Sequence, residues 1–152
     1  RSSTLAAAVV LATAGAVMFA PAAQALDPRQ DWHGHFSNPY TALQNRATGH
    51  CLTSVVGGLA VTTAECDRSA RQLWDTPSYD GDHYYLKNRE TGRCLTSVVG
   101  GLAVTTAECD RSARQAWHPE KLDAEGTLRN LATGKCLTAV LGGLDVTTAE
   151  CE

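Results

Sequence analysis

The hydrophobic and polar positions of this chain follow two different patterns, and the change falls near residue 25. Residues 5–20 form an Ala-rich, largely apolar stretch behind Arg1, and a small-residue Ala-Gln-Ala sequence follows at 23–25. This arrangement is typical of a secretory signal. A retained membrane anchor is the alternative, although a spanning helix needs about 20 apolar residues with a charged residue after them. We expect a secretory signal at 1–25 and one secreted domain at 26–152, free of the membrane.

After residue 25 the chain alternates short apolar and polar stretches that are rich in Val and Thr. β-Branched residues pack well on a pleated sheet, and no dozen consecutive residues of this part hold a clean helical period. Thr-Gly and Gly-Gly dipeptides separate the stretches and favour hairpin turns. The pattern predicts an all-β domain with about four strands per repeated unit, hence about twelve strands.

One unit of about 42 residues occurs three times. Residues 51–72 read CLTSVVGGLAVTTAECDRSARQ, residues 94–115 repeat all 22 of them, and residues 136–152 form a shorter, slightly changed copy. The first two copies continue into Arg-Gln-x-Trp, whereas the third copy stops before it. The missing Arg-Gln-x-Trp stands at 29–32, near the other end of the chain.

The spacing of the repeated Gln residues predicts that the ring of units is closed. Gln30 precedes Gln72 by 42 residues and Gln72 precedes Gln115 by 43, and joining residue 152 to residue 26 preserves this spacing. We therefore expect an N-terminal strand to complete the third unit. The expected units are about 30–71, 72–114 and 115–152, the last closed by 26–29.

All six cysteines follow residue 25, two in each unit and 15 residues apart. An even number of cysteines behind a secretory signal indicates an oxidising compartment and disulfides. A hairpin centred on the Gly58–Leu59 bond would set Cys51 opposite Cys66, near enough to bridge. A metal site is the weaker interpretation, since no Cys-x-x-Cys exists and no site collects four ligands. The predicted pairs are Cys51–Cys66, Cys94–Cys109 and Cys136–Cys151.

Three tryptophans, Trp32, Trp74 and Trp117, recur once per unit, each two residues after a Gln. We predict that their indoles converge in the core near a pseudo-threefold axis, with each N–H bonded. A platform on which sugars stack is the alternative. We expect repeated aliphatic residues to join the core: Leu52, Leu95, Leu137, Val61, Val104 and Val146.

Charge and motifs narrow the function. The part after residue 25 carries 12 of the 13 basic residues and all 16 acidic ones, so its net charge is −4. Without a basic stripe, nucleic acid is not an expected partner. Gly-x-Ser-x-Gly and phosphate-loop motifs are absent from the sequence, and unit-related acids would lie on separate lobes. We predict a non-catalytic monomer without cofactor or metal.

The histidines are His33, His35, His50, His83 and His118. Most stand in segments that lead into the repeats, which favours surface loop positions. His33-Gly34-His35, with Asp31 nearby, is the alternative as a weak metal site.

Three units of about 42 residues, each with a Cys pair and a Gln-x-Trp, resemble the ricin-type β-trefoil lectins and the family-13 carbohydrate-binding modules. The resemblance covers residues 26–152. It implies a β-trefoil of twelve strands that binds a glycan or polysaccharide at up to three shallow sites, one per unit.

Each expected sugar site departs from the family pattern. The family usually has an Asp two residues after the first Cys, an aromatic residue two before the second Cys, and often an Asn before the Gln. Here Thr, Ala and Arg stand at these positions, and Thr and Ala remove a carboxylate and a stacking surface. The affected residues are Thr53, Thr96, Thr138, Ala64, Ala107, Ala149, Arg29, Arg71 and Arg114.

A polar set remains in each unit. An Arg could hold an acidic sugar or another anion, whereas pairing with Asp67, Asp110 or Glu152 is the plainer interpretation. We predict a secreted carbohydrate-binding module with modified sites. The alternative is a secreted trefoil that recognises or inhibits a protein through loops 33–40 or 75–85, the latter with Tyr79, Tyr84 and Tyr85. The candidate sugar-binding residues are Thr53, Thr62, Arg71, Gln72, Thr96, Thr105, Arg114, Gln115, Thr138, Thr147, Arg29 and Gln30.

Overall fold

Short strands and single turns of 3-10 helix (η) succeed one another along the chain in the computed structural model, which describes residues 27–37, 39–120 and 125–152. The expected secretory signal at 1–25 lies outside the described residues. The first third contains η1 (Pro28–Gln30), β1 (Trp32–Ser37), β2 (Tyr40–Asn45), β3 (Cys51–Ser54) and β4 (Val61–Ala64). The second contains η2 (Ala70–Gln72), β5 (Trp74–Asp75), β6 (Lys87–Asn88), β7 (Cys94–Ser97) and β8 (Val104–Ala107). The last contains η3 (Ala113–Gln115), β9 (Trp117–Pro119), β10 (Glu125–Gly126), β11 (Leu128–Asn130), β12 (Cys136–Ala139) and β13 (Val146–Ala149).

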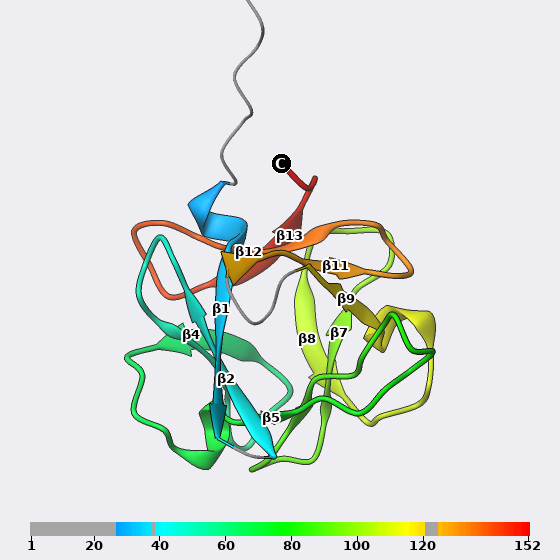
Figure 1. The fold of residues 1–152 in the computed structure, drawn as a ribbon, viewed down its shortest axis with the longest axis horizontal. Helices are drawn as coiled ribbons and strands as arrows, with labels where there is room; N and C mark the ends of the chain where they lie inside the picture. The colour runs from blue at the N-terminus through cyan, green and yellow to red at the C-terminus, as the bar shows by residue number, and fades with distance from the viewer. Residues whose placement is uncertain (1–26, 38, 121–124) are drawn as a thin grey trace, which may run out of the picture.

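These elements confirm the expected all-β fold with three similar units (Figure 1). Each unit has four strands if β10 and β11, which are separated only by Thr127, count as one. A nine-stranded sheet runs from β10 through β1, β2, β5, β6 and β7 to β8, with β3 and β4 branching from β2. The other sheet has the order β13-β12-β11-β9. Because β10 of the last unit pairs with β1 of the first, the ring of units is closed by strand pairing.

One hairpin recurs in every unit, as β3–β4, β7–β8 and β12–β13, and all three copies have the same register. In the first hairpin Cys51 pairs with Ala64, which centres the turn between Gly57 and Gly58. The expected register, with Cys51 opposite Cys66, is therefore wrong by two residues at the partner strand. Gly57 has a φ of +92°, a left-handed conformation that glycine adopts without strain, and this tightens the turn one residue earlier.

In each unit, one disulfide links the start of the hairpin to the segment just beyond its end. Cys66 lies two residues past the end of β4, and the Cα atoms of Cys51 and Cys66 are 5.1 Å apart. The bonded pairs are those expected from the 15-residue spacing. They are Cys51–Cys66, Cys94–Cys109 and Cys136–Cys151.

The hairpin loops interlock the three units in a cycle. The Leu144 carbonyl in the third loop accepts bonds from the Thr63 backbone N–H and from the Thr63 hydroxyl, both at 2.8 Å. In the same way, the Leu59 carbonyl of the first loop accepts hydrogen bonds from the backbone N–H and the hydroxyl of Thr106 in the second unit. The Leu102 carbonyl of the second loop completes the cycle at Thr148. Each unit thus fixes the next by hydrogen bonds that no single unit could make alone.

The core lies on the pseudo-threefold axis and is built from one set of apolar residues per unit. Trp32, Trp74 and Trp117 are at most 1% exposed. Two expected core residues, Val104 and Val146, are only partly buried and pack against the core from its edge. The cluster comprises Trp32, Leu43, Leu52, Val61, Trp74, Leu86, Leu95, Trp117, Leu128, Leu137 and Ala139.

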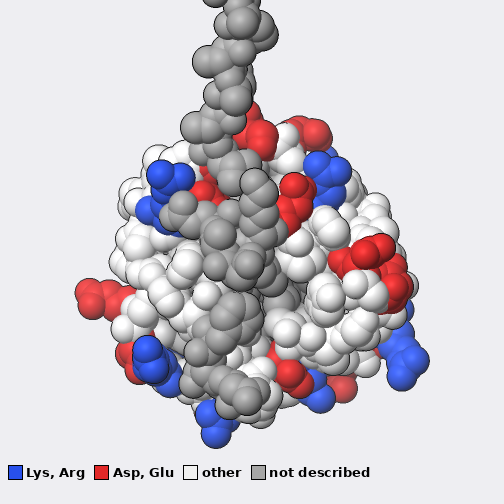
Figure 2. Space-filling view, in the orientation of Figure 1, with Lys and Arg blue, Asp and Glu red and all other residues white. Residues whose placement is uncertain are grey.

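The surface is mixed in charge. On the face shown in Figure 2, Lys and Arg side chains alternate with Asp and Glu side chains around the rim of the described part. Among the described residues, no helix is long and apolar enough to cross a membrane.

Candidate functional site

The glutamine of each Gln-x-Trp is buried and uses its side-chain amide inside the protein. Gln72 Nε2 donates to Thr53 Oγ1 at 3.1 Å and to the Glu65 carbonyl at 2.8 Å. Gln72 Oε1 accepts from the Asp67 N–H at 2.8 Å. Thr53 is buried as well, and its hydroxyl donates to the Cys51 carbonyl. Both amide hydrogens of Gln72 are therefore used in bonds inside the protein. Thr53 and Gln72, both candidate sugar-binding residues, face each other rather than solvent.

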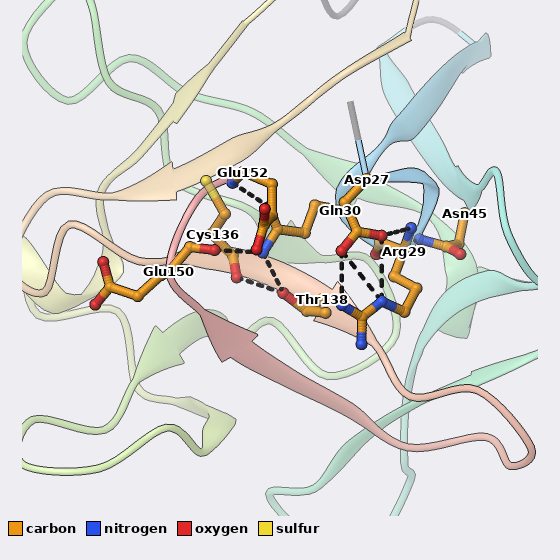
Figure 3. Close-up of polar contacts among 8 residues, drawn as sticks. All are labelled: Asp27, Arg29, Gln30, Asn45, Cys136, Thr138, Glu150 and Glu152. Atoms are coloured by element: carbon orange, nitrogen blue, oxygen red, sulfur yellow. Dashed lines mark hydrogen bonds and ion pairs between the residues drawn. The ribbon is translucent and has the colours of Figure 1, made fainter. Parts of the chain in front are cut away.

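The other two units repeat this arrangement. Gln115 bonds Thr96 at 3.1 Å in the second unit. In the third unit the glutamine comes from the N-terminal turn η1: Gln30 Nε2 donates to Thr138 Oγ1 at 3.1 Å and to the Glu150 carbonyl at 2.8 Å (Figure 3). The closing segment that we expected as a strand is thus a 3-10 turn that leads into β1.

The indoles of the three tryptophans point inward and bond the adjacent hairpins. Trp74 Nε1 donates to the Leu52 carbonyl at 3.1 Å. The same bond joins Trp32 to Leu137 and Trp117 to Leu95, each at 3.0 Å. A fully buried ring cannot stack on a sugar, so the tryptophans are core residues and not a binding platform.

The second threonine of each candidate set is half-buried and also bonded internally. The Thr62 hydroxyl donates to the Leu144 carbonyl at 2.9 Å, within the cycle that locks the units together. Thr105 and Thr147 make the equivalent bonds to Leu59 and Leu102. Their hydroxyl hydrogens are committed, which leaves only oxygen lone pairs for a ligand.

The arginines before the glutamines have a fixed backbone and partly exposed side chains. The buried Asn88 side chain donates to the Arg71 carbonyl at 2.8 Å, while its oxygen accepts N–H bonds from the Thr-Gly turn. Asn45 and Asn130 hold the carbonyls of Arg29 and Arg114 in the same way. Each Asn thus joins the start of one repeat to the Arg-Gln-x-Trp that precedes it.

The arginines differ in their ion pairs. Arg29 pairs with Asp27 at 2.6 Å, not with Glu152, and this bond is the main cause of the lowered pKa of Asp27. Arg114 lies 3.6 Å from Asp110, as the plainer interpretation expected. Hydrogen bonds from Ser112 lower the pKa of Asp110, with a smaller contribution from the charge of Arg114.

Arg71 stands apart from the other two arginines. In the described part of the chain it forms no hydrogen bond or ion pair through its guanidinium. Hydrogen bonds from Ser69 are the main cause of the lowered pKa of Asp67, and the charge of Arg71 makes a smaller contribution. Of the twelve candidate residues, Arg71 and Arg114 are therefore the best placed to reach a ligand.

The histidine pair that could have held a metal lies on strand β1, so residues 33–37 do not form the surface loop that we expected. The rings of His33 and His35 are 4.5 Å apart between centroids, and His35 bonds Gln44. The nearby Asp31 carboxylate is buried and bonded by Arg46. Among the described residues, no group of three or more His, Cys, Asp or Glu is arranged to hold a metal ion.

Two features of the site were not found from the sequence. Arg68 and Arg111 have left-handed backbones, with φ of 59° and 62°, and each borders a pocket beside its unit's disulfide. Lys87 lines the second of these pockets. Lys87 could have been found from the sequence. Residues 51–72 and 94–115 are identical, so any difference between the first two units must come from the segments that lead into them, and Lys87 is in one of these segments.

Comparison with known proteins identifies the family. The sequence model of the ricin-type β-trefoil lectin domain matches residues 15–152. The chain belongs to this family. A comparison with curated proteins found no match for this lectin domain.

Solved structures agree in fold. A designed threefold-symmetric protein, ThreeFoil, superposes with a TM-score of 0.66 at 20% identity, covering 74% of this lectin domain chain and 89% of its own. The cytolethal distending toxin of Actinobacillus actinomycetemcomitans gives 0.60 at 15% identity over 82% of both chains. A GlcNAcα1-4Gal-releasing endo-β-galactosidase from Clostridium perfringens gives 0.66 at 18% identity, covering 76% of this chain and 30% of that enzyme.

Proposed function

We propose that this chain is a secreted, non-catalytic carbohydrate-binding domain with modified sugar sites. The match of the ricin-type lectin model to residues 15–152 carries the proposal. The repeated geometry supports it, because all three units keep the buried Gln and the turn that presents an Arg to solvent.

We assign each candidate residue of a unit a role according to how deeply it is buried. The Thr53–Gln72 pair is the support of the site, since both side chains are buried and bonded to each other. Arg71 is the contact residue, because its backbone is fixed by Asn88 and its half-buried side chain forms no hydrogen bond or ion pair in the described part of the chain. Thr62 supplies oxygen lone pairs. Arg114 and Arg29 have the corresponding roles, with Arg29 weakened by its bond to Asp27.

Arginine favours an acidic ligand group. A guanidinium donates paired, charge-assisted hydrogen bonds to a carboxylate or sulfate, and these bonds are stronger than those to neutral hydroxyls. The proposed ligands are therefore glycans that carry uronic acids or similar groups.

Secretion is the second part of the proposal. Three disulfides fit an oxidising compartment, and the apolar stretch at 5–20 fits a signal for export. The mature protein is expected to begin at Leu26 and to be a monomer. Mass spectrometry of the N-terminus of the exported protein tests this cleavage site. An exported protein that still carries residues 1–25 would contradict the proposed cleavage.

A glycan array with neutral and acidic glycans tests the binding function. We expect binding to acidic glycans that the double variant Arg71→Ala, Arg114→Ala weakens about tenfold or more. Arg89→Ala is the control, because Arg89 is an exposed arginine outside the candidate set that lies over the Tyr40 ring. If the array shows no bound glycan, the lectin function is wrong and a secreted trefoil that recognises a protein becomes the better account.

A further inference from the structure

A pocket of about 310 Å³ lies beside the Cys94–Cys109 disulfide of the second unit. Its lining includes both cysteines of the disulfide, the tyrosines Tyr79 and Tyr85, and the basic residues Lys87 and Arg111. The pocket does not include Thr96, Arg114 or Gln115, which occupy the family's sugar-binding positions.

The aromatic side of the pocket is held in place by its backbone. The rings of Tyr79 and Tyr85 are 5.6 Å apart between centroids and nearly perpendicular, at 75°. Tyr79 N–H bonds the His83 carbonyl at 2.7 Å, and the neighbouring Tyr84 exchanges two backbone bonds with Trp117 on β9. This loop is therefore anchored to the core, and the half-buried tyrosine rings offer a surface that is already ordered before a ligand binds.

The charged residues that line the pocket are both basic. Lys87 and Arg111 are exposed, and in the described part of the chain neither side chain forms a hydrogen bond or ion pair. Asp75 faces Lys87 across the β5–β6 pair, and its carboxylate accepts the Thr76 N–H. Asp110, next to Arg111, lies toward Arg114 instead. Two cations thus border the pocket, and no carboxylate is among its described lining residues.

The buried glutamine of the unit positions Arg111. Gln115 Oε1 accepts the Asp110 N–H at 2.8 Å, and the Asp110 carboxylate accepts the Ser112 N–H at 2.9 Å. These bonds fix the turn in which Arg111 has its left-handed φ of 62°. Gln115 therefore acts as a positioning residue for a cation outside the family's sugar site.

The first unit contains a natural counterpart of the pocket. It has the same disulfide position and Arg68 in the same left-handed turn, but its lining also includes Gln72, whereas Gln115 does not line the second-unit pocket. Because Leu43 corresponds to Leu86, Ala42 and Gln44 of the first unit stand where the second unit has Tyr85 and Lys87. The first pocket is correspondingly smaller, about 160 Å³. The second-unit pocket thus has a tyrosine where the first has Ala42 and a lysine where the first has Gln44.

We propose that this second-unit pocket binds an anionic sugar residue, with its acidic group between Lys87 and Arg111 and its ring against Tyr79 and Tyr85. The inference rests on the proposed carbohydrate-binding function and places one site outside the family's position. Carboxylates and sulfates share the required chemistry, since both accept charge-assisted hydrogen bonds from Arg and Lys. The tyrosines supply the apolar face that a sugar ring covers.

Isothermal titration of the full chain tests this site with three oligosaccharides of similar length: oligogalacturonate, a sulfated galacto-oligosaccharide and its neutral parent. The matched variants are Arg111→Gly and Arg68→Gly, because glycine keeps either left-handed turn without strain. We expect an anionic ligand to bind, Arg111→Gly to raise its Kd about tenfold or more, and Arg68→Gly to change it less than about twofold. The oligogalacturonate and sulfated arms identify which acidic group is preferred.

Two further variants separate charge from stacking. Lys87→Gln and Tyr85→Ala convert the pocket toward that of the first unit, and both are expected to weaken binding while thermal unfolding stays two-state. Equal binding of neutral and anionic ligands, or equal effects of Arg111→Gly and Arg68→Gly, overturns the site and leaves the lectin function standing. Failure of every glycan on the array overturns both proposals.

Discussion

Gln30 donates a hydrogen bond to Thr138 across 108 positions of the sequence, and this bond joins the two ends of the described chain (Figure 3). The bond is equivalent to the one between Gln72 and Thr53 within the first unit, with the same length of 3.1 Å. The Glu150 carbonyl accepts a second bond from Gln30 at 2.8 Å, and the backbone N–H of Glu152 donates a third at 2.9 Å. Ring closure therefore repeats, between the ends, a contact that the other units make locally.

Gln30→Ala should destabilise the whole domain. The variant leaves the buried Thr138 hydroxyl and the Glu150 carbonyl with one partner fewer, at a cost of about 1–3 kcal/mol in unfolding free energy. Urea unfolding measures this change, and Arg29→Ala serves as the neighbouring control with a smaller effect. A loss under about 0.5 kcal/mol for Gln30→Ala would contradict the closing role of η1.

The interlocking loops give a second stability prediction. Thr148→Val removes the hydroxyl bond to the Leu102 carbonyl at a fully buried position and should cost about 1 kcal/mol. Thr147→Val removes a bond to the same carbonyl at a half-buried position, where water can replace it, so the expected cost is smaller. Thermal unfolding of both variants compares them directly. Equal stability of Thr148→Val and the unchanged protein would argue against the cycle of loop contacts.

The Asp27–Arg29 pair predicts an acid-sensitive contribution. The hydrogen bond from the Arg29 side chain is the main cause that holds the pKa of Asp27 below its ordinary value of 3.8. Because the folded-state pKa is the lower one, the stabilisation is present above the unfolded-state pKa and is lost as pH falls through the folded-state pKa. Asp27→Asn should therefore destabilise the protein modestly at neutral pH, since Arg29 is partly exposed, and progressively less as the pH falls below 3.8. Unfolding measured at neutral pH and at a series of acidic pH values tests this, and a cost that is independent of pH would refute the assignment.

The disulfides give a prediction that does not depend on a ligand. Replacing both Cys94 and Cys109 by Ala opens a bridge with a sequence separation of 15 and should cost about 3 kcal/mol. The same double replacement of Cys51 and Cys66 is the matched comparison, because the hairpins have the same register. If the unfolding free energies of the two variants differ strongly, the first two units contribute unequally to stability although their hairpins have the same register.

The sequence was sufficient for features that follow from repetition. Equal Cys spacing predicted the disulfide pairs, and the matching Gln spacing predicted that Gln30 serves the third unit. The hairpin register was missed because symmetry about Gly58–Leu59 assumed that bridged cysteines face each other in paired strands. Cys66 instead lies beyond its strand, while the left-handed Gly57 sets the turn.

The roles of the polar candidates could not be predicted from the sequence in the same way. A Thr two residues after a Cys looks like a substituted ligand, but burial pairs it with Gln72. The bond from Thr62 to Leu144 joins different units and has no local signal. The second-unit pocket likewise depends on Tyr85 and Lys87 meeting Arg111 in space. Burial and contacts between segments decide these roles, and a linear pattern contains neither.

The structure of the full chain with bound oligogalacturonate tests the central claim most directly, namely that solvent-facing cations bind the ligand while the Thr–Gln pairs stay buried. The account predicts an acidic sugar with its carboxylate within hydrogen-bond distance of Arg111 and Lys87, or of Arg71 or Arg114, and unchanged bonds from Gln72 and Gln115 to Thr53 and Thr96. A sugar bonded directly to the side chains of Gln72 or Gln115, with the Thr–Gln bonds broken, would contradict it.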